Sequence, residues 1–300
     1  MEHLGKRMNT MTTATTRPSA PRAPATRRRR ERTWLLTVPA LALVIPVFLI
    51  PTVLVLSTAF TEAPAGLTHI RDVFTSSLAL GVLGRSLFVS LIVTVISLVL
   101  ALPYAMFVVK AGARLRNLLL GAVLCTLFFS VIVRAYAWLA LLGKGGPIPE
   151  ALHAIGLMGA DGSLAHTRTA TIIAMTQYGV PYMLLALYDN IRRLDPALER
   201  AAAICGANRV TRFFRVSLPL MLPGIASGSI IVFVTTLGYY IIPAVVGSPQ
   251  DMMVGQLISV QINTATNWGF GAAIGAVLAV VALVCFVLFR LVGRLERRYR

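Results

Sequence analysis

Residues 86–109 read SLFVSLIVTVISLVLALPYAMFVV, a stretch of 24 residues without a charged side chain. As an α-helix, at 1.5 Å per residue, it is long enough to cross the roughly 30 Å hydrocarbon core of a bilayer. A helix is the expected form because lipid offers the backbone no hydrogen-bond partner. Similar runs flank this stretch at residues 34–60, 117–142, 169–188, 219–246 and 269–289. The sequence therefore predicts an all-α, polytopic integral membrane protein with six transmembrane helices.

The composition of the whole chain excludes a soluble globular protein. Of its 300 residues, 57% are hydrophobic and 13% are charged, and the mean hydropathy is +0.77. Soluble domains are typically about 45–50% apolar and about 25% charged. On a soluble protein, the formal charge of +17 would suggest nucleic acid as a partner. Here the basic residues lie between apolar runs and no nucleic-acid-binding module is recognisable, so we expect contact with membrane lipid and no nucleic acid.

The basic residues are distributed unevenly along the chain. Of the 28 Lys and Arg residues, 23 lie in the N-terminal segment, in the loops after the second and fourth apolar runs, and in the C-terminal segment. Loops rich in Lys and Arg stay on the cytoplasmic side of a membrane. We therefore expect both termini in the cytoplasm, which agrees with an even number of spans. Within this plan residues 1–33 are a disordered basic cytoplasmic tail, residues 34–295 the transmembrane domain and residues 296–300 a cytoplasmic C-terminus.

Side chains that carry out catalysis or bind metals are not grouped in this sequence. The four histidines lie in the N-terminal tail or in outer loops, and Cys125, Cys205 and Cys285 show no paired or zinc-binding spacing. There is no phosphate-binding Walker motif either. We therefore expect no enzymatic activity, no metal site and no cofactor in this chain.

The loop at residues 189–217 is the most unusual part of the sequence. It reads DNIRRLDPALERAAAICGANRVTRFFRVS. The Asp-Pro pair at 195–196 is typical of a helix start, and Gly206 can end that helix in the left-handed conformation. Asn208 can cap a second short helix, which Pro219 would stop. The sequence predicts a cytoplasmic helix–glycine–helix hairpin just before a membrane span, with small residues on its first helix.

This loop resembles the EAA loop of ABC-importer permeases, whose pattern is Glu-Ala-Ala-x-x-x-Gly followed, after a spacer, by Leu-Pro. The matching residues are Ala201, Ala202, Gly206, Leu218 and Pro219. The glutamate departs from the pattern, because Arg200 occupies its place and Glu199 lies one residue earlier. The resemblance implies that this loop docks a cytoplasmic ATPase subunit. An amphipathic helix that simply lies on the membrane surface is the alternative.

Two further stretches resemble the spermidine/putrescine branch of this binding-protein-dependent, MetI-like permease family. They are Val133–Ile148, at the end of the third apolar run, and Gly238–Gly275, after the fifth. The resemblance implies a permease that passes a polyamine from an extracytoplasmic binding protein to the cytoplasm. A permease for iron, thiamine or opines is the alternative, because related proteins for these solutes look similar in the same stretches.

The same resemblance implies a multi-subunit complex in the inner membrane of a bacterium. A second, different permease subunit would pair with this chain around one pathway. Two ATP-hydrolysing subunits would lie below the pair, and the binding protein would lie above it. ATP and Mg²⁺ would be bound by the ATPase subunits and not by this chain.

Polar and aromatic residues within the apolar runs are candidates for the solute pathway: Arg134, Tyr136, Trp138, Tyr178, Tyr182, Tyr239 and Tyr240. Arg134 either extends to the outer headgroups or faces the pathway or the partner permease, as a gate or a structural group. The aromatic residues either form an interfacial belt or hold amines by cation–π attraction. No Asp or Glu lies well inside a run, which favours a permissive pathway whose specificity resides in the binding protein.

Two other classes of membrane protein fit the sequence less well. A self-sufficient secondary transporter tends to carry intramembrane charges and inverted repeats, which the sequence does not display. A membrane-embedded enzyme would need polar catalytic residues clustered at one depth of the membrane, and no such cluster is present in the apolar runs.

Overall fold

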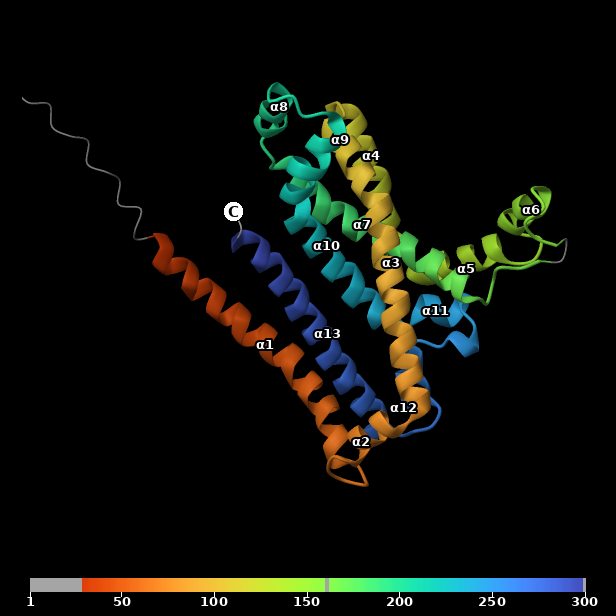
Figure 1. Ribbon diagram of the computed structural model, residues 1–300. Coiled ribbons are helices and arrows are strands. Elements are labelled where there is room, and N and C mark those ends of the chain that lie inside the picture. Colours follow the sequence, from red (N-terminus) through yellow and green to blue (C-terminus); the bar gives the residue numbers. More distant parts are fainter. Residues whose placement is uncertain (1–28, 160–161, 299–300) are drawn as a thin grey trace, which may run out of the picture. The chain divides into compact units, whose positions relative to one another are not determined.

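The computed structural model describes residues 29–159 and 162–298, and all regular secondary structure within them is helical (Figure 1). The all-α prediction is therefore confirmed. The chain divides into two compact units between Thr52 and Val53. Most of helix α1 (Arg29–Thr61) belongs to the first unit, and the other helices belong to the second. Residues 1–28 of the predicted tail lie outside the described part of the chain.

Helix α1 begins at Arg29, so the last five residues of the predicted tail are helical instead. Residues 29–33 consist mainly of Arg and Glu, which are good helix formers, and the helix therefore starts before the apolar run. The helix also continues through Pro39, Pro46 and Pro51. Proline is tolerated in membrane helices because nearby groups can satisfy the carbonyls that it leaves free.

Five helical stretches in the described residues are long and apolar enough to cross a membrane. They are α1, α3 (Ser77–Lys110), α7 (Arg168–Arg192), the stretch Arg209–Leu237 that contains α10 (Leu218–Leu237), and α13 (Trp268–Arg298). The uncharged stretch at residues 86–109 lies entirely within α3. These helices agree with five of the six predicted spans.

The remaining predicted span, at residues 117–142, is the third along the chain, and it is not one straight helix. Helix α4 (Ala113–Phe128) meets the segment Val131–Ala154 at a bend of 99°. That segment comprises α5 (Val131–Leu142) and α6 (Pro147–Ala154). Ser130 caps α5 in a non-helical conformation, and the three residues after it are β-branched and disfavour helix slightly. The expectation of a continuous helix is wrong, although the bent pair still counts as a sixth candidate span.

The span predicted at residues 219–246 ends earlier than expected. Helix α10 ends at Leu237, with Gly238 as its C-cap, and glycine is a poor helix former. The following residues form a separate short helix, α11 (Ile241–Val246), which packs against α5 and α7. Residues 238–246 therefore pack beside the bent α4–α5 pair and do not lengthen α10.

Helices α3, α7 and α10 form the centre of the second unit (Figure 1). A Cβ at Gly179 of α7 would lie 2.9 Å from side-chain atoms of both Ser97 of α3 and Val232 of α10. Only glycine therefore allows the three helices to meet at this point. Gly224 and Gly228 of α10 face α7 just as closely. Small residues at such crossings let membrane helices pack by direct backbone approach.

A second hydrophobic cluster joins α2 (Thr68–Thr75), α12 (Val254–Asn263) and the first turns of α3 and α13. Between α11 and α12 lies the single turn η3 (Pro249–Asp251). Arg168, at the start of α7, binds the Asp251 carboxylate through two nitrogens at 2.5 and 2.8 Å. Arg85 of α3 donates to the carbonyl of Gln250. These two arginines hold the connection between α11 and α12 against α3 and α7.

Candidate functional site

The loop at residues 189–217 folds into the expected helix–glycine–helix hairpin. Helix α8 (Pro196–Ile204) starts at Asp195, whose carboxylate accepts from the Ala197 amide at 2.8 Å. It ends before Gly206, which has a φ of +81°. The side chain of Asn208 then caps α9 (Arg209–Arg212) by accepting from the Thr211 amide at 2.7 Å. Each of these local features was predicted from the sequence.

The second arm of the hairpin does not stop at Pro219, contrary to the expectation. Helix α9 continues through the π-helical turn η2 (Phe213–Ser217) directly into α10. The Leu218 amide donates to the carbonyl of Phe213, five residues earlier. Pro219 has no amide hydrogen to place in the ladder, and the π-helical turn directly before it lets the helix continue past the proline. The hairpin is therefore joined to the membrane helix without a flexible connection.

Glu199, the displaced acidic residue of the loop, contacts the second arm of the hairpin. The Ser217 hydroxyl donates to Glu199 Oε1 at 2.6 Å, a length typical of hydroxyl–carboxylate hydrogen bonds. Ser217 is only 3% exposed, whereas Glu199 is partly exposed. In the described part of the chain Glu199 has no ion-pair partner. Its hydrogen bond joins α8 to the start of α10, and nothing in the sequence singled out Ser217 for this role.

The hairpin exposes several large apolar side chains among its arginines. Ile204 is 87% exposed, and Leu198, Val210 and Phe214 are also exposed. Ala201 is exposed and Ala202 half-buried beside them. A Cβ at Gly206 would meet nothing within 4 Å, so its positive φ and not lack of space requires glycine there. Exposed apolar surface of this kind marks a protein or membrane contact.

Arg134 stabilises the bend between α4 and α5. Its side chain is only 8% exposed and folds back onto the end of α4. The guanidinium Nη2 donates to the carbonyls of Thr126 and Phe129 at 2.5 and 3.2 Å. A helix end leaves its last carbonyls without intrahelical partners, and Arg134 supplies donors to those of α4. Its guanidinium carbon also lies 5.9 Å from the centre of the Tyr178 ring, within cation–π range.

The aromatic pathway candidates fall into three groups. The rings of Tyr182 and Tyr239 lie 5.3 and 4.6 Å from that of Tyr178, and the Tyr182 hydroxyl donates to that of Tyr178 at 3.5 Å. We call these three residues the tyrosine cluster. Tyr136 and Tyr240 are exposed and lie outside it. Trp138 contributes to a separate cavity.

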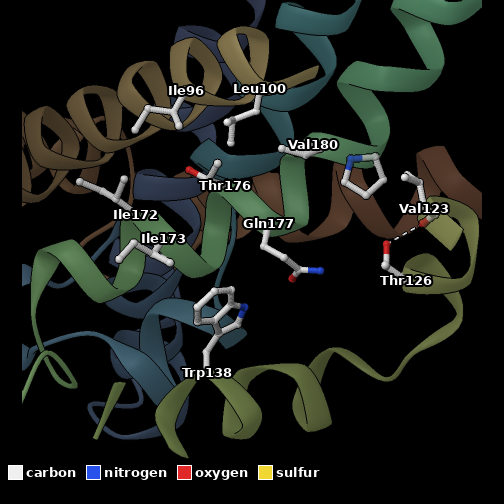
Figure 2. A pocket seen from close by; sticks show the side chains of 11 residues that line it. Ile96, Leu100, Val123, Thr126, Trp138, Ile172, Ile173, Thr176, Gln177 and Val180 are labelled. Atoms are coloured by element: carbon white, nitrogen blue, oxygen red, sulfur yellow. Dashed lines mark hydrogen bonds between the residues drawn. The ribbon is translucent and has the colours of Figure 1, made fainter. Parts of the chain in front are cut away.

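This cavity has a volume of about 490 Å³ and lies between α3, α4, α5 and α7. Its walls are mostly apolar, with Ile96 and Leu100 on α3 and Ile172, Ile173 and Val180 on α7. Figure 2 shows Gln177 projecting from α7 toward the side where Trp138 of α5 lies. The cavity exists because α4 and α5 diverge at the bend, so the sequence, read as one straight span, gave no sign of it.

Comparisons with known proteins agree with this architecture. Residues 94–300 match the family described as "Binding-protein-dependent transport system inner membrane component". The chain is 32% identical to the spermidine/putrescine transport system permease protein PotB of Haemophilus influenzae, over 83% of this chain and 90% of that protein. It is 30% identical to PotB of Escherichia coli, over 84% of this chain and 94% of that protein.

A solved structure has the same fold. It belongs to a bacterial ABC transporter involved in the import of the acidic polysaccharide alginate; the TM-score is 0.72 at 20% identity, over 90% of this chain and 98% of that one. Together with the apolar helices, these matches identify a multi-pass protein of the bacterial inner membrane that is not itself an enzyme. The chain belongs to the family of binding-protein-dependent transport system inner membrane components and is a permease subunit of an ABC importer.

Proposed function

We propose that this chain is one of two permease subunits of a polyamine importer that carries spermidine, putrescine or both. The observation that carries the proposal is the 32% identity with a spermidine/putrescine permease along 90% of that protein's length. A match of this extent includes the membrane helices as well as the cytoplasmic hairpin. The direction of transport in the proposal is inward, from an extracytoplasmic binding protein to the cytoplasm.

In this proposal the hairpin at residues 189–217 lies in the cytoplasm and docks an ATP-hydrolysing subunit. Two features support this assignment. The exposed side chains of Leu198, Ile204 and Val210 offer apolar surface for a groove on a partner. The continuous path from α9 through η2 into α10, together with the bond between Glu199 and Ser217, provides a rigid link from that surface to a membrane helix. Closure of two ATPase subunits, which bind ATP and Mg²⁺, would then move α10.

The solute specificity of the complex resides in the binding protein rather than in this chain. The tyrosine cluster offers uncharged aromatic faces, which attract amines weakly. No Asp or Glu lies well inside the predicted spans, so no carboxylate is available there to retain a polyamine. Such a pathway suits passage between two different permeases, with a binding protein seated on the extracytoplasmic side.

Uptake of labelled putrescine and spermidine tests the proposed function. The gene and its neighbouring transport genes are expressed in cells that lack other polyamine importers, with and without this chain. We expect ATP-dependent uptake only when the chain is present. If polyamine uptake does not depend on the chain, whereas uptake of iron, thiamine or an opine does, the polyamine proposal is wrong and the chain serves an importer of that other solute.

A further inference from the structure

The base of the hairpin lies at a depth that the packing of the membrane helices defines. Helices α3, α7 and α10 meet around Gly179. Thirteen residues along each helix from this crossing, the chain reaches three positions on the hairpin side: Lys110 from Ser97, Arg192 from Gly179 and Pro219 from Val232. At 1.5 Å per residue, all three lie about 20 Å from the crossing. Two of the three positions are basic, and basic side chains avoid the hydrocarbon core, so this level marks one edge of it.

Beyond this edge the second arm of the hairpin carries an arginine at every third position: Arg209, Arg212 and Arg215. Arg215 lies about 6 Å and Arg212 about 10 Å past Pro219 along the helix. The headgroup layer on each side of a bilayer is about 5–8 Å thick. Since a long arginine side chain can extend toward the membrane, the guanidinium groups of both residues can reach lipid headgroups.

No partner for these arginines lies within the described residues. Arg209, Arg212 and Arg215 make no ion pair or side-chain hydrogen bond there, whereas Arg193 pairs with Asp189 at 2.9 Å. Arg209 and Arg215 are exposed, and Arg212 is partly exposed. Residues three positions apart are neighbours on a helix surface, where like charges destabilise the helix. A bound anion would remove this repulsion.

An exposed aromatic side chain lies between two of these arginines in the sequence. Phe214 is 60% exposed, and its ring packs edge-to-face against Phe213 with 5.0 Å between the ring centres. An apolar ring at headgroup depth can enter the boundary between headgroups and acyl chains, as in amphipathic interfacial helices. We propose that Arg212 and Arg215 bind the phosphate of an anionic phospholipid while Phe214 contacts its acyl chains. A guanidinium suits this role because it can hold two phosphate oxygens at once.

A lipid fits this surface better than an acidic patch of the ATPase subunit does. Arg212, Arg215 and Phe214 lie within about two helical turns of the membrane edge. Leu198 and Ile204, on α8, remain available to the ATPase subunit. The second arm continues through η2 into α10 without a flexible connection. A lipid held at this arm therefore fixes the position from which α10 moves, and transport should require anionic lipid whichever solute the complex carries.

The test uses the complete complex and two readouts. Native mass spectrometry of the detergent-purified complex measures how much added phosphatidylglycerol it retains, compared with phosphatidylcholine. Solute uptake into proteoliposomes is then measured as the phosphatidylglycerol fraction of a phosphatidylcholine bilayer rises. The double variant Arg212→Gln/Arg215→Gln removes both charges, and Arg212→Lys/Arg215→Lys keeps them. The matched control, Arg114→Gln/Arg116→Gln, removes two charges from the loop between α3 and α4, where residues two positions apart do not face each other.

For each arginine removed, we expect the affinity for phosphatidylglycerol to fall about fivefold, the contribution of one basic residue near an anionic surface. The double Gln variant should therefore lose the response of uptake to phosphatidylglycerol, whereas the double Lys variant should keep most of it. The control should respond nearly like the parent. Because the substituted side chains have no partner in the described part of the chain, membrane abundance and co-purification of the ATPase subunit should not change.

Three results would overturn the proposal. Equal retention of phosphatidylglycerol by the parent and the double Gln variant would show that the arginines do not hold the lipid. An equal loss in the Arg114→Gln/Arg116→Gln control would show a diffuse attraction to the whole basic surface instead of a site. Loss of the ATPase subunit from the double Gln variant would show that the arginines contact that subunit. Lipid retention is measured without solute, so its outcome is independent of whether the complex carries a polyamine.

Discussion

The hydrogen bond between Ser217 and Glu199 should determine how strongly ATP hydrolysis is coupled to transport. It connects α8 with the start of α10 at 2.6 Å, and Ser217 is 3% exposed. A hydrogen bond to a charged group contributes about 1.5–3 kcal/mol. Glu199 is partly exposed and can bind water once Ser217 is removed, so the lower end of this range applies. Ser217→Ala should therefore shift the ratio of attached to detached α8 by about tenfold.

The assay is the number of solute molecules transported per ATP in proteoliposomes that contain the complete complex. A detached α8 still binds the ATPase subunit but moves α10 less, so Ser217→Ala should reduce transport more than stimulated ATP hydrolysis. Glu199→Gln keeps an acceptor and should lie between the parent and Glu199→Ala. Ser227→Ala is the matched control, because the Ser227 hydroxyl bonds within α10, to the Gly224 carbonyl at 3.1 Å.

A double-mutant cycle separates this bond from other roles of the glutamate. Ser217→Ala and Glu199→Ala remove the same interaction, so the double variant should be no worse than the more damaging single variant. Additive losses would show that Glu199 acts on a group other than Ser217, such as a residue of the ATPase subunit. An unchanged transport-to-ATP ratio in Ser217→Ala would refute the coupling role of the bond outright.

Three other predictions concern the hairpin, the bend and the topology. Gly206→Val should abolish polyamine uptake, because a β-branched residue resists a φ of +81°. Gly206→Asn should retain part of the uptake, because asparagine tolerates that conformation. Equal uptake by the two variants would refute the conformational argument. Arg134→Ala should lower the melting temperature of the detergent-solubilised protein more than Arg134→Lys does, because alanine leaves the carbonyls of Thr126 and Phe129 without this donor. Equal melting temperatures of the two variants would contradict the role of Arg134 at the bend. Single cysteines introduced at residues 189–217 in a chain without its native cysteines should resist an impermeant thiol reagent in intact cells, and labelling from outside would reverse the topology.

Local sequence signals predicted the hairpin well because its features depend on neighbouring residues. The cap at Asp195, the left-handed Gly206 and the cap at Asn208 are each specified within a few positions. The long apolar runs predicted the spanning helices for the same reason, since length and hydrophobicity are additive along the chain.

The errors arose where specific side-chain contacts and backbone geometry, which hydropathy and helix-stop signals do not report, decide the conformation. The bend after Phe128 is stabilised by Arg134, whose carbonyl contacts cannot be foreseen from hydropathy. Pro219 was expected to end a helix, but the π-helical turn before it carries the chain into α10. Ser217 became relevant only through a glutamate 18 positions away. The cavity was missed because it is a consequence of the bend.

Cross-linking from the native Cys205 tests most directly whether the hairpin couples the chain to an ATPase. Cys205 is exposed beside Gly206 on the hairpin, so it needs no engineering, while Cys125 and Cys285 are replaced by serine. A thiol-reactive photo-cross-linker attached to Cys205 in the complete complex should join this chain to the ATP-hydrolysing subunit, and Gly206→Val should reduce the yield. Cross-links to the binding protein or to lipid alone, from a complex in which the ATPase subunit co-purifies, would contradict the account.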